Sequence, residues 1–80
     1  MEEKLFEVVE DIVFRVTGKK GLVMETDFVK DLGLTSLDVM NMICAFEDRF
    51  DMEIPTREVW KLHYVRDVID YMIKKGITEV

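Results

Sequence analysis

The sequence predicts an all-α fold, a small bundle of three longer helices and one short helix in a single domain over residues 1–80. Apolar residues repeat at helical spacing in three segments, and glycine or proline lies soon after each of them. No segment alternates polar and apolar residues with the period of two that marks a strand. With 80 residues and a hydrophobic fraction of 49%, the chain is long and apolar enough to fold around one core.

The first helix is predicted over residues 3–16, followed by a long loop. Leu5, Val9 and Ile12 form one apolar stripe at helical spacing, and Gly18 is expected to end the helix in a left-handed conformation. Residues 17–35 show no sustained period. We expect three apolar side chains of this loop to anchor it to the core: Phe28, Leu32 and Leu34.

The second helix is predicted over residues 36–50, and it has two apolar stripes. The first contains Val39, Ile43, Phe46 and Phe50. The second is displaced around the helix and contains Leu37, Met40 and Cys44. Either both stripes are buried, or one of them is presented to another molecule.

The remaining helices are shorter. Pro55 excludes helical geometry at Ile54, and Thr56 is expected to cap a short helix over residues 57–62. The last helix is predicted over residues 65–74 and ends before Gly76. Its start is poorly marked, because Tyr64 is not a good capping residue.

Few side chains suit catalysis or metal binding. The chain has one histidine, His63, and one cysteine, Cys44, and the spacings of zinc modules and of calcium-binding EF-hand loops are absent. Because Cys44 falls in an apolar stripe, we expect it to be buried and structural. A thiol enzyme built on Cys44 and His63 is the alternative, but it lacks a third supporting residue. The sequence therefore predicts a protein that is not an enzyme and has no metal site.

The negative charge is concentrated in one part of the chain. Residues 25–58 contain nine acidic and three basic side chains, which accounts for the whole net charge of −6. Such a field repels nucleic acid and anionic membranes and attracts basic protein surfaces, unless it serves solubility alone. The N-terminal MEEK lacks a secretion signal, and no apolar run is long enough to span a membrane. We expect a cytoplasmic monomer without membrane insertion.

Ser36 lies between a flexible loop and the second helix, in the stretch DLGLTSLDVM. A serine at this position is usually the N-cap of the helix. Thr35 could serve instead, in a capping box with Asp38. Ser36 would then be the first helical residue, and its hydroxyl would project from a helix N-terminus that favours a phosphate group. The local sequence permits a phosphate ester at Ser36 without requiring one.

The stretch DFVKDLGLTSLDVMNMICAFEDRFDMEIP resembles the acyl carrier protein family, and the similarity extends over nearly the whole chain. The resemblance implies that Ser36 receives phosphopantetheine from coenzyme A through a phosphopantetheinyl transferase. The terminal thiol of that arm would hold acyl intermediates as thioesters and deliver them to partner enzymes of fatty-acid, polyketide or related biosynthesis. The alternative is an unmodified helical module of similar fold that acts only through the surface of its second helix.

The resemblance also implies a surface that acyl-transferring, synthase and reductase enzymes with basic docking surfaces would recognise. Its residues would be Leu37, Asp38, Met40, Asn41, Cys44, Glu47 and Asp48. Family members can shelter an acyl chain between helices, and the candidates here are Phe28, Ile43, Phe46 and Ile54. Thr35 stands where the family usually has an acid, and Arg57 and Lys61 add bases to the short helix. These departures suggest a specialised carrier with its own set of enzymes.

Overall fold

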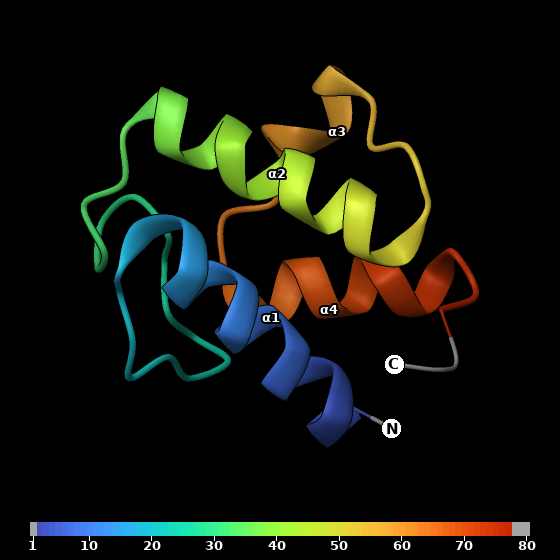
Figure 1. Cartoon of the computed structure of the whole chain (residues 1–80), viewed down its shortest axis with the longest axis horizontal. Coiled ribbons are helices and arrows are strands. Elements are labelled where there is room, and N and C mark those ends of the chain that lie inside the picture. Colours follow the sequence, from blue (N-terminus) through green and yellow to red (C-terminus); the bar gives the residue numbers. More distant parts are fainter. Residues whose placement is uncertain (1, 78–80) are drawn as a thin grey trace.

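The computed structural model describes residues 2–77, which form four helices (Figure 1). These are α1 (Glu2–Thr17), α2 (Ser36–Phe50), α3 (Thr56–Val59) and α4 (Val65–Lys74). Within residues 2–77 there is no strand, only an isolated bridge between Asp27 and Tyr64. The predicted all-α class is confirmed, and the predicted bounds of α2 and α4 agree with the structure.

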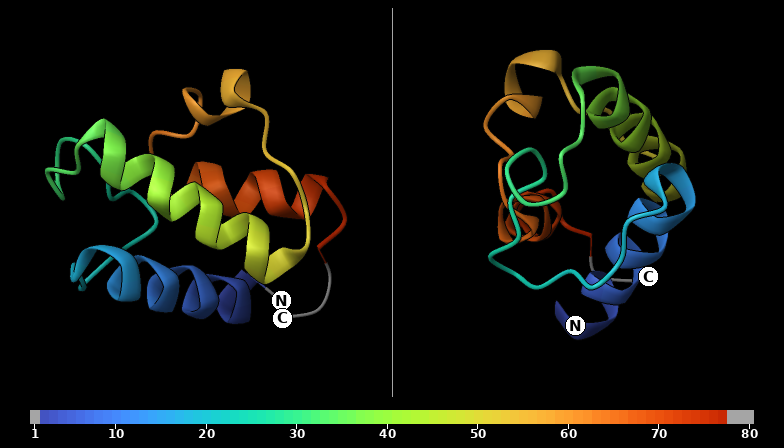
Figure 2. Two further views of the ribbon diagram at one scale, coloured as in Figure 1. Left: turned by 45° about the horizontal axis from the view of Figure 1, so that its top comes forward. Right: turned by 90° about the vertical axis from the view of Figure 1, so that its left-hand side faces the viewer.

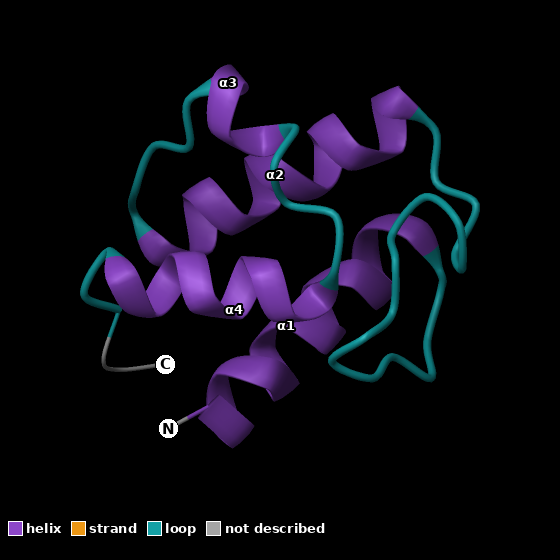
Figure 3. Ribbon diagram, turned by 180° about the vertical axis from the view of Figure 1, so that it is seen from behind, coloured by secondary structure: helices purple, strands orange, loops and turns teal. Residues whose placement is uncertain are grey.

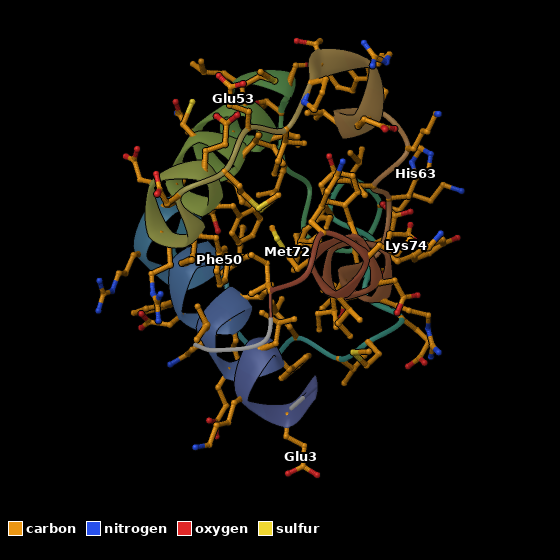
Figure 4. All side chains as sticks on the ribbon, turned by 90° about the vertical axis from the view of Figure 1, so that its right-hand side faces the viewer. Glu3, Phe50, Glu53, His63, Met72 and Lys74 are labelled. Atoms are coloured by element: carbon orange, nitrogen blue, oxygen red, sulfur yellow. The ribbon has the colours of Figure 1, made fainter. Side chains whose placement is uncertain are left out.

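The three longer helices pack around one apolar core. α1 contacts both α2 and α4. In Figure 3, which shows the molecule from behind, α3 lies at the edge of the bundle away from α1. Figure 2 shows α1 and α2 running side by side in opposite directions. Met72 of α4 turns inward and is fully buried, whereas Glu3, Glu53 and Lys74 extend from the outside (Figure 4). Burial of the apolar faces of α1, α2 and α4 in this core supplies the main stabilisation of so small a domain.

The long loop between α1 and α2 is fixed to the segment that enters α4. The backbone N–H of Phe28 donates to the carbonyl of His63 at 3.0 Å, and that of Val65 donates to Thr26 at 3.0 Å. Phe28 and Leu34 are buried, with 2% and 5% of their surface exposed. Leu32 is half-buried against the same core, so the predicted anchoring of this loop is confirmed.

A buried aspartate organises the turn that leads toward α2. Asp27 is 7% exposed, and its Oδ1 accepts hydrogen bonds from the backbone N–H groups of Val29 (2.9 Å) and Lys30 (2.8 Å). The pKa of Asp27 lies below its usual value, mainly because the backbone N–H of Lys30 donates to its carboxylate. Burial opposes this shift, whereas the N–H of Val29 and the charges of Lys30 and His63 also lower the pKa. Asp31 Oδ2 accepts in turn from the N–H of Asp27 at 2.8 Å. The two carboxylates thus hold the loop in one conformation.

The structure corrects the prediction for the short helix. α3 begins at Thr56, with Pro55 as its N-cap and no capping hydrogen bond from a side chain, so the expected cap at Thr56 is wrong. α3 also ends at Val59, before the predicted end at residue 62. The chain continues as tighter turns, with the N–H of Lys61 bonded to Glu58 and that of Leu62 bonded to Val59, both at 3.0 Å. Apolar spacing over six residues did not distinguish a helix from such turns.

The start of α4 is marked by a side chain inside the helix. Asp67 Oδ2 accepts from the backbone N–H groups of His63 and Tyr64, each at 3.0 Å. These bonds satisfy donors ahead of the first turn, and the negative charge of Asp67 also suits the helix N-terminus. Tyr64 is therefore held in place although its side chain is a poor cap.

Candidate functional site

The first turn of α2 is closed by Thr35 and not by Ser36. Thr35 Oγ1 accepts from the backbone N–H of Asp38 at 3.1 Å, and Asp38 Oδ2 accepts from the N–H of Thr35 at 3.0 Å. This reciprocal pair is a capping box in which aspartate replaces the more usual glutamate. Of the two alternatives left open by the sequence, capping by Thr35 is confirmed.

Ser36 is consequently the first residue of α2, and it is exposed. Within residues 2–77 its hydroxyl makes no hydrogen bond with another residue. The loop before it is well held, because Gly33 adopts a φ of 66° and its N–H donates to Val29 at 2.9 Å. The site therefore presents a primary hydroxyl at a helix N-terminus, where backbone N–H groups and the helix dipole stabilise a phosphate.

The two apolar stripes of α2 have different environments. The face directed at the core contains Val39, Met42, Ile43 and Phe46, all buried. In the second stripe Leu37 is 70% exposed, Met40 is half-buried, and Cys44 is exposed. Burial of both stripes is thereby excluded, and the second stripe is presented to solvent beside Ser36.

Cys44 differs from the expectation drawn from its apolar neighbours. It was expected to be buried, and it is an exposed thiol. The reason is geometric: Cys44 shares a helix face with Leu37 and Met40, whereas the residues of α2 that join the buried core lie on another face. His63 is also exposed, in the loop between α3 and α4. No group of three or more His, Cys, Asp or Glu side chains in the described part of the chain could hold a metal ion.

The acidic side chains of α2 have separate roles. Asp38 closes the capping box, and Glu47 Oε2 accepts from the backbone N–H of Ile54 at 2.8 Å. Asn41 and Asp48 are exposed. At the end of the helix Glu47 and Asp48 line a shallow hollow of about 340 Å³ together with Asp51, Met52 and Glu53. Some of the predicted surface acids thus also fix the backbone.

The four residues considered for an acyl pocket lie close to the centre of the bundle. Phe28, Ile43, Phe46 and Ile54 are each at most 5% exposed and belong to one buried cluster. They line the interior between α2 and the loops around it, and an acyl chain would have to displace their contacts to enter.

Comparison with known proteins defines the class. The model of a family described as phosphopantetheine attachment site matches residues 7–72, a range that contains all of α2, α3 and the loop before Ser36. The fold and this match define a phosphopantetheine-dependent carrier. Its cofactor is phosphopantetheine, attached covalently.

The relatives agree with this class. The chain is 38% identical over 78 residues to the acyl carrier protein of Syntrophus aciditrophicus (strain SB), covering 98% of this chain and 95% of that protein. It is 40% identical over 70 residues to the acyl carrier protein of Clostridium acetobutylicum, covering 85% and 91%. A solved structure assigned as an acyl carrier protein from Mycobacterium tuberculosis superposes with a TM-score of 0.83 at 26% identity, covering 89% and 97%. The chain belongs to the acyl carrier protein family.

Membership of this family settles the broad function. Acyl carrier proteins are carriers and not catalysts, and they interact with biosynthetic enzymes. Separately, none of the helices within residues 2–77 has the length and apolar character needed to cross a bilayer.

Proposed function

We propose that Ser36 is the attachment site of phosphopantetheine, and that the chain delivers thioester-bound acyl intermediates to enzymes of fatty-acid, polyketide or related biosynthesis. The observation that supports this most directly is the capping of α2 by Thr35, which leaves the exposed Ser36 hydroxyl without a hydrogen bond to the backbone of residues 2–77. Ser36 is also the one serine of the chain. The positive end of the α2 dipole stabilises the phosphodiester that forms there.

In the attachment reaction Ser36 Oγ bonds to the phosphorus that bears the pantetheine arm of coenzyme A. The bond between that phosphorus and the adenosine 3′,5′-bisphosphate part breaks, and the serine proton passes to a base of the transferase. The chain contributes an accessible nucleophile in a fixed position, because the loop before Ser36 is held by Asp27 and Asp31. Once attached, the arm would supply a terminal thiol that holds the acyl group as a thioester.

A surface beside Ser36 suits the partner enzymes, and we name it the α2 docking face. It consists of Leu37, Asp38, Met40, Asn41, Cys44, Glu47 and Asp48. Its centre is the second apolar stripe, with Leu37 and Cys44 exposed and Met40 half-buried, and its acids attract basic surfaces of the transferase, synthases and reductases. A small apolar centre with a charged rim is typical of weak, fast-exchanging contacts.

The departures from the family motif suggest a dedicated set of enzymes. Thr35 replaces an acid directly before Ser36, and Asn41 removes a further charge from the docking face. A partner enzyme with a basic side chain opposite Thr35 or Asn41 loses the attraction of a negative charge there, and no new attraction replaces it. We infer a specialised carrier that acts in the cytoplasm as a monomer.

Intact mass measurement tests the attachment site. The protein and its Ser36→Ala variant are incubated with coenzyme A and a broad-specificity transferase, with Thr56→Ala as a hydroxyl-removing control at an exposed position. We expect a phosphopantetheine-sized mass gain in the wild type and in the control, and none in Ser36→Ala. No gain in any of the three would support the unmodified interaction module. A gain in Ser36→Ala would assign the arm to another residue.

A further inference from the structure

A second surface hollow lies on the side of α1 that faces away from α2. It has a volume of about 810 Å³ and runs between the first half of α1 and the turn at residues 23–25. Its floor is apolar and formed by Phe6, Val23 and Met24. In Figure 1 the loop that contains this turn runs below α1, whereas α2 lies above it. We call this hollow the α1 groove.

Part of the apolar floor of the α1 groove is formed by residues 23 and 24, whose backbone is held by hydrogen bonds while their side chains stay adaptable. The N–H of Val23 donates to Thr26 Oγ1 at 2.8 Å, and the N–H of Thr26 donates back to the Val23 carbonyl at 3.0 Å. The carbonyl of Met24 accepts from the N–H of Arg66 at 2.9 Å, which ties the turn to α4. Val23 is 56% exposed in spite of this ordered backbone. The backbone of residues 23–26 is therefore ordered before a partner binds, which lowers the entropic cost of binding.

The rim of the α1 groove is acidic. Glu3, Glu7 and Glu10 line it from α1, and Glu25 lines it from the turn. Glu25 pairs with Arg66, while the three α1 glutamates that line the groove make no salt bridge within the part of the chain that the structure describes. Glu3 and Glu7 are exposed and Glu10 is half-buried. An apolar floor beside the carboxylates of Glu3, Glu7 and Glu10 suits a ligand that has both apolar and positively charged groups.

The arrangement of these charges narrows the class of occupant. No three acidic side chains within residues 2–77 converge closely enough to hold a metal ion, so a compact cation does not fit. Anionic lipid surfaces and nucleic acid are repelled by the same carboxylates. Lysine and arginine side chains spaced along a peptide can reach each glutamate separately, while apolar side chains of that peptide cover the floor.

We propose that the α1 groove binds a basic amphipathic segment of a partner protein. One or two apolar side chains of this segment lie against Phe6, Val23 and Met24, and its lysine or arginine side chains pair with Glu3, Glu7 and Glu10. The eight residues from Glu3 to Glu10 extend over about 12 Å, the length of about two turns of a partner helix. Met24 is half-buried and flexible, so it adjusts to the shape of the apolar side chain. The α2 docking face stays available to a second protein.

Amide chemical shifts of the full chain test this proposal. The probe is a synthetic peptide of about 12 residues with leucine at helical spacing among lysines, and the control peptide has glutamate in place of lysine. We expect the largest shifts at residues 3–10 and 23–25 with the lysine peptide, and none with the glutamate peptide. Added salt should weaken the binding.

Matched variants separate the groove from the rest of the acidic surface. The double variant Glu3→Gln/Glu10→Gln should weaken peptide binding at the groove about tenfold, a loss of about 1.4 kcal/mol. Asp51→Asn/Glu53→Gln removes the same charge just after the end of α2, at exposed positions outside the α2 docking face, and should leave groove binding unchanged. Ser36→Ala should bind like the wild type, so the result stands apart from the test of the attachment site.

Three outcomes would overturn the proposal. The first is a set of shifts confined to α2, and the second is equal weakening by the groove variant and the Asp51→Asn/Glu53→Gln variant. The third is a change in the groove amides when the concentration of the protein alone is raised. That change would assign the groove to a second copy of this chain.

Discussion

Glu47 Oε2 lies 2.8 Å from the backbone nitrogen of Ile54 and accepts its hydrogen bond across the turn between α2 and α3. Ile54 is 5% exposed, so its N–H would be cut off from water without this acceptor. The same turn contains Asp51 in a left-handed conformation with a φ of 50°. A side chain on α2 thereby determines where the chain leaves the helix and approaches α3.

Replacement of Glu47 by alanine should destabilise the fold. Because the buried N–H of Ile54 loses its partner, we expect the free energy of unfolding to fall by about 1–3 kcal/mol. Denaturant titration measures this change. Glu47→Gln keeps an oxygen acceptor and should lose less, while Asp48→Asn, at an exposed position without such a bond, should lose almost nothing. Equal stabilities for Glu47→Ala and Asp48→Asn would show that this hydrogen bond does not contribute to the free energy of unfolding.

Replacement of Thr35 by alanine should destabilise α2 without preventing modification. The variant removes the acceptor for the N–H of Asp38, which typically lowers the free energy of unfolding by about 1 kcal/mol. Thermal unfolding should show a decrease of a few degrees, and Thr35→Ser should restore most of it. The Ser36 hydroxyl is unaffected, so mass gain with coenzyme A should persist. If Thr35→Ala alone abolished the gain under folded conditions, Thr35 would belong to the recognition site.

Asp27 should contribute a pH-dependent part of the stability. Its pKa is lower in the folded chain than in the unfolded one, chiefly because the N–H of Lys30 donates to it. Its contribution is therefore complete above the unfolded pKa of about 3.9 and is lost as the pH falls through the lower folded value. Unfolding of the wild type and Asp27→Asn at a series of pH values isolates this part. The difference between the two should be largest at neutral pH and should shrink below about pH 4.

An unchanged difference down to the lowest pH at which both proteins fold would contradict this assignment. Asp70→Asn is a suitable control, because Asp70 is exposed on α4, and neither of its carboxylate oxygens accepts a hydrogen bond within the described residues. Its effect on stability should be small at every pH.

Salt should stabilise the fold through the acidic end of α2. Asp48, Asp51 and Glu53 line one hollow, and they form no salt bridge within residues 2–77. Counterions screen their mutual repulsion, with a Debye length of about 10 Å at 0.1 M, so the melting temperature should rise with added salt or magnesium. The triple variant Asp48→Asn/Asp51→Asn/Glu53→Gln should melt higher at low salt and respond less. A falling or flat salt response in the wild type would contradict the prediction.

Most of the helical structure could be predicted from local patterns. The bounds of α2 and α4 followed from apolar spacing, and the Thr35–Asp38 capping box was one of two alternatives visible in the stretch TSLD. α3 could not be predicted in this way, because six residues give too few turns for a period to be recognised. The role of Asp67 at the start of α4 had a sequence signal, an acid three residues after the capping position, but Tyr64 obscured it.

The candidate site was only partly accessible to sequence reasoning. Ser36 and the two stripes of α2 were recognised, but the apolar pattern predicted a buried Cys44 where only the resemblance placed it on the surface, and the backbone role of Glu47 was not recognised. The carboxylates of Asp27 and Asp31 looked like part of a diffuse negative charge, and the structure shows that they hold the loop before Ser36. A count of charges cannot show which of them are bonded to the backbone.

The sequence by itself determined where α2 and α4 lie, that either Thr35 or Ser36 closes α2, and that one serine stands at the start of that helix. Apolar spacing and capping chemistry act within a few residues, so they can be recognised without knowledge of the fold. Only the tertiary structure decided which stripe of α2 is buried, that Glu47 bonds to Ile54, and that α1 and residues 23–25 enclose a groove. Those features depend on which faces neighbouring segments cover, and segments far apart in the chain become neighbours only when it folds.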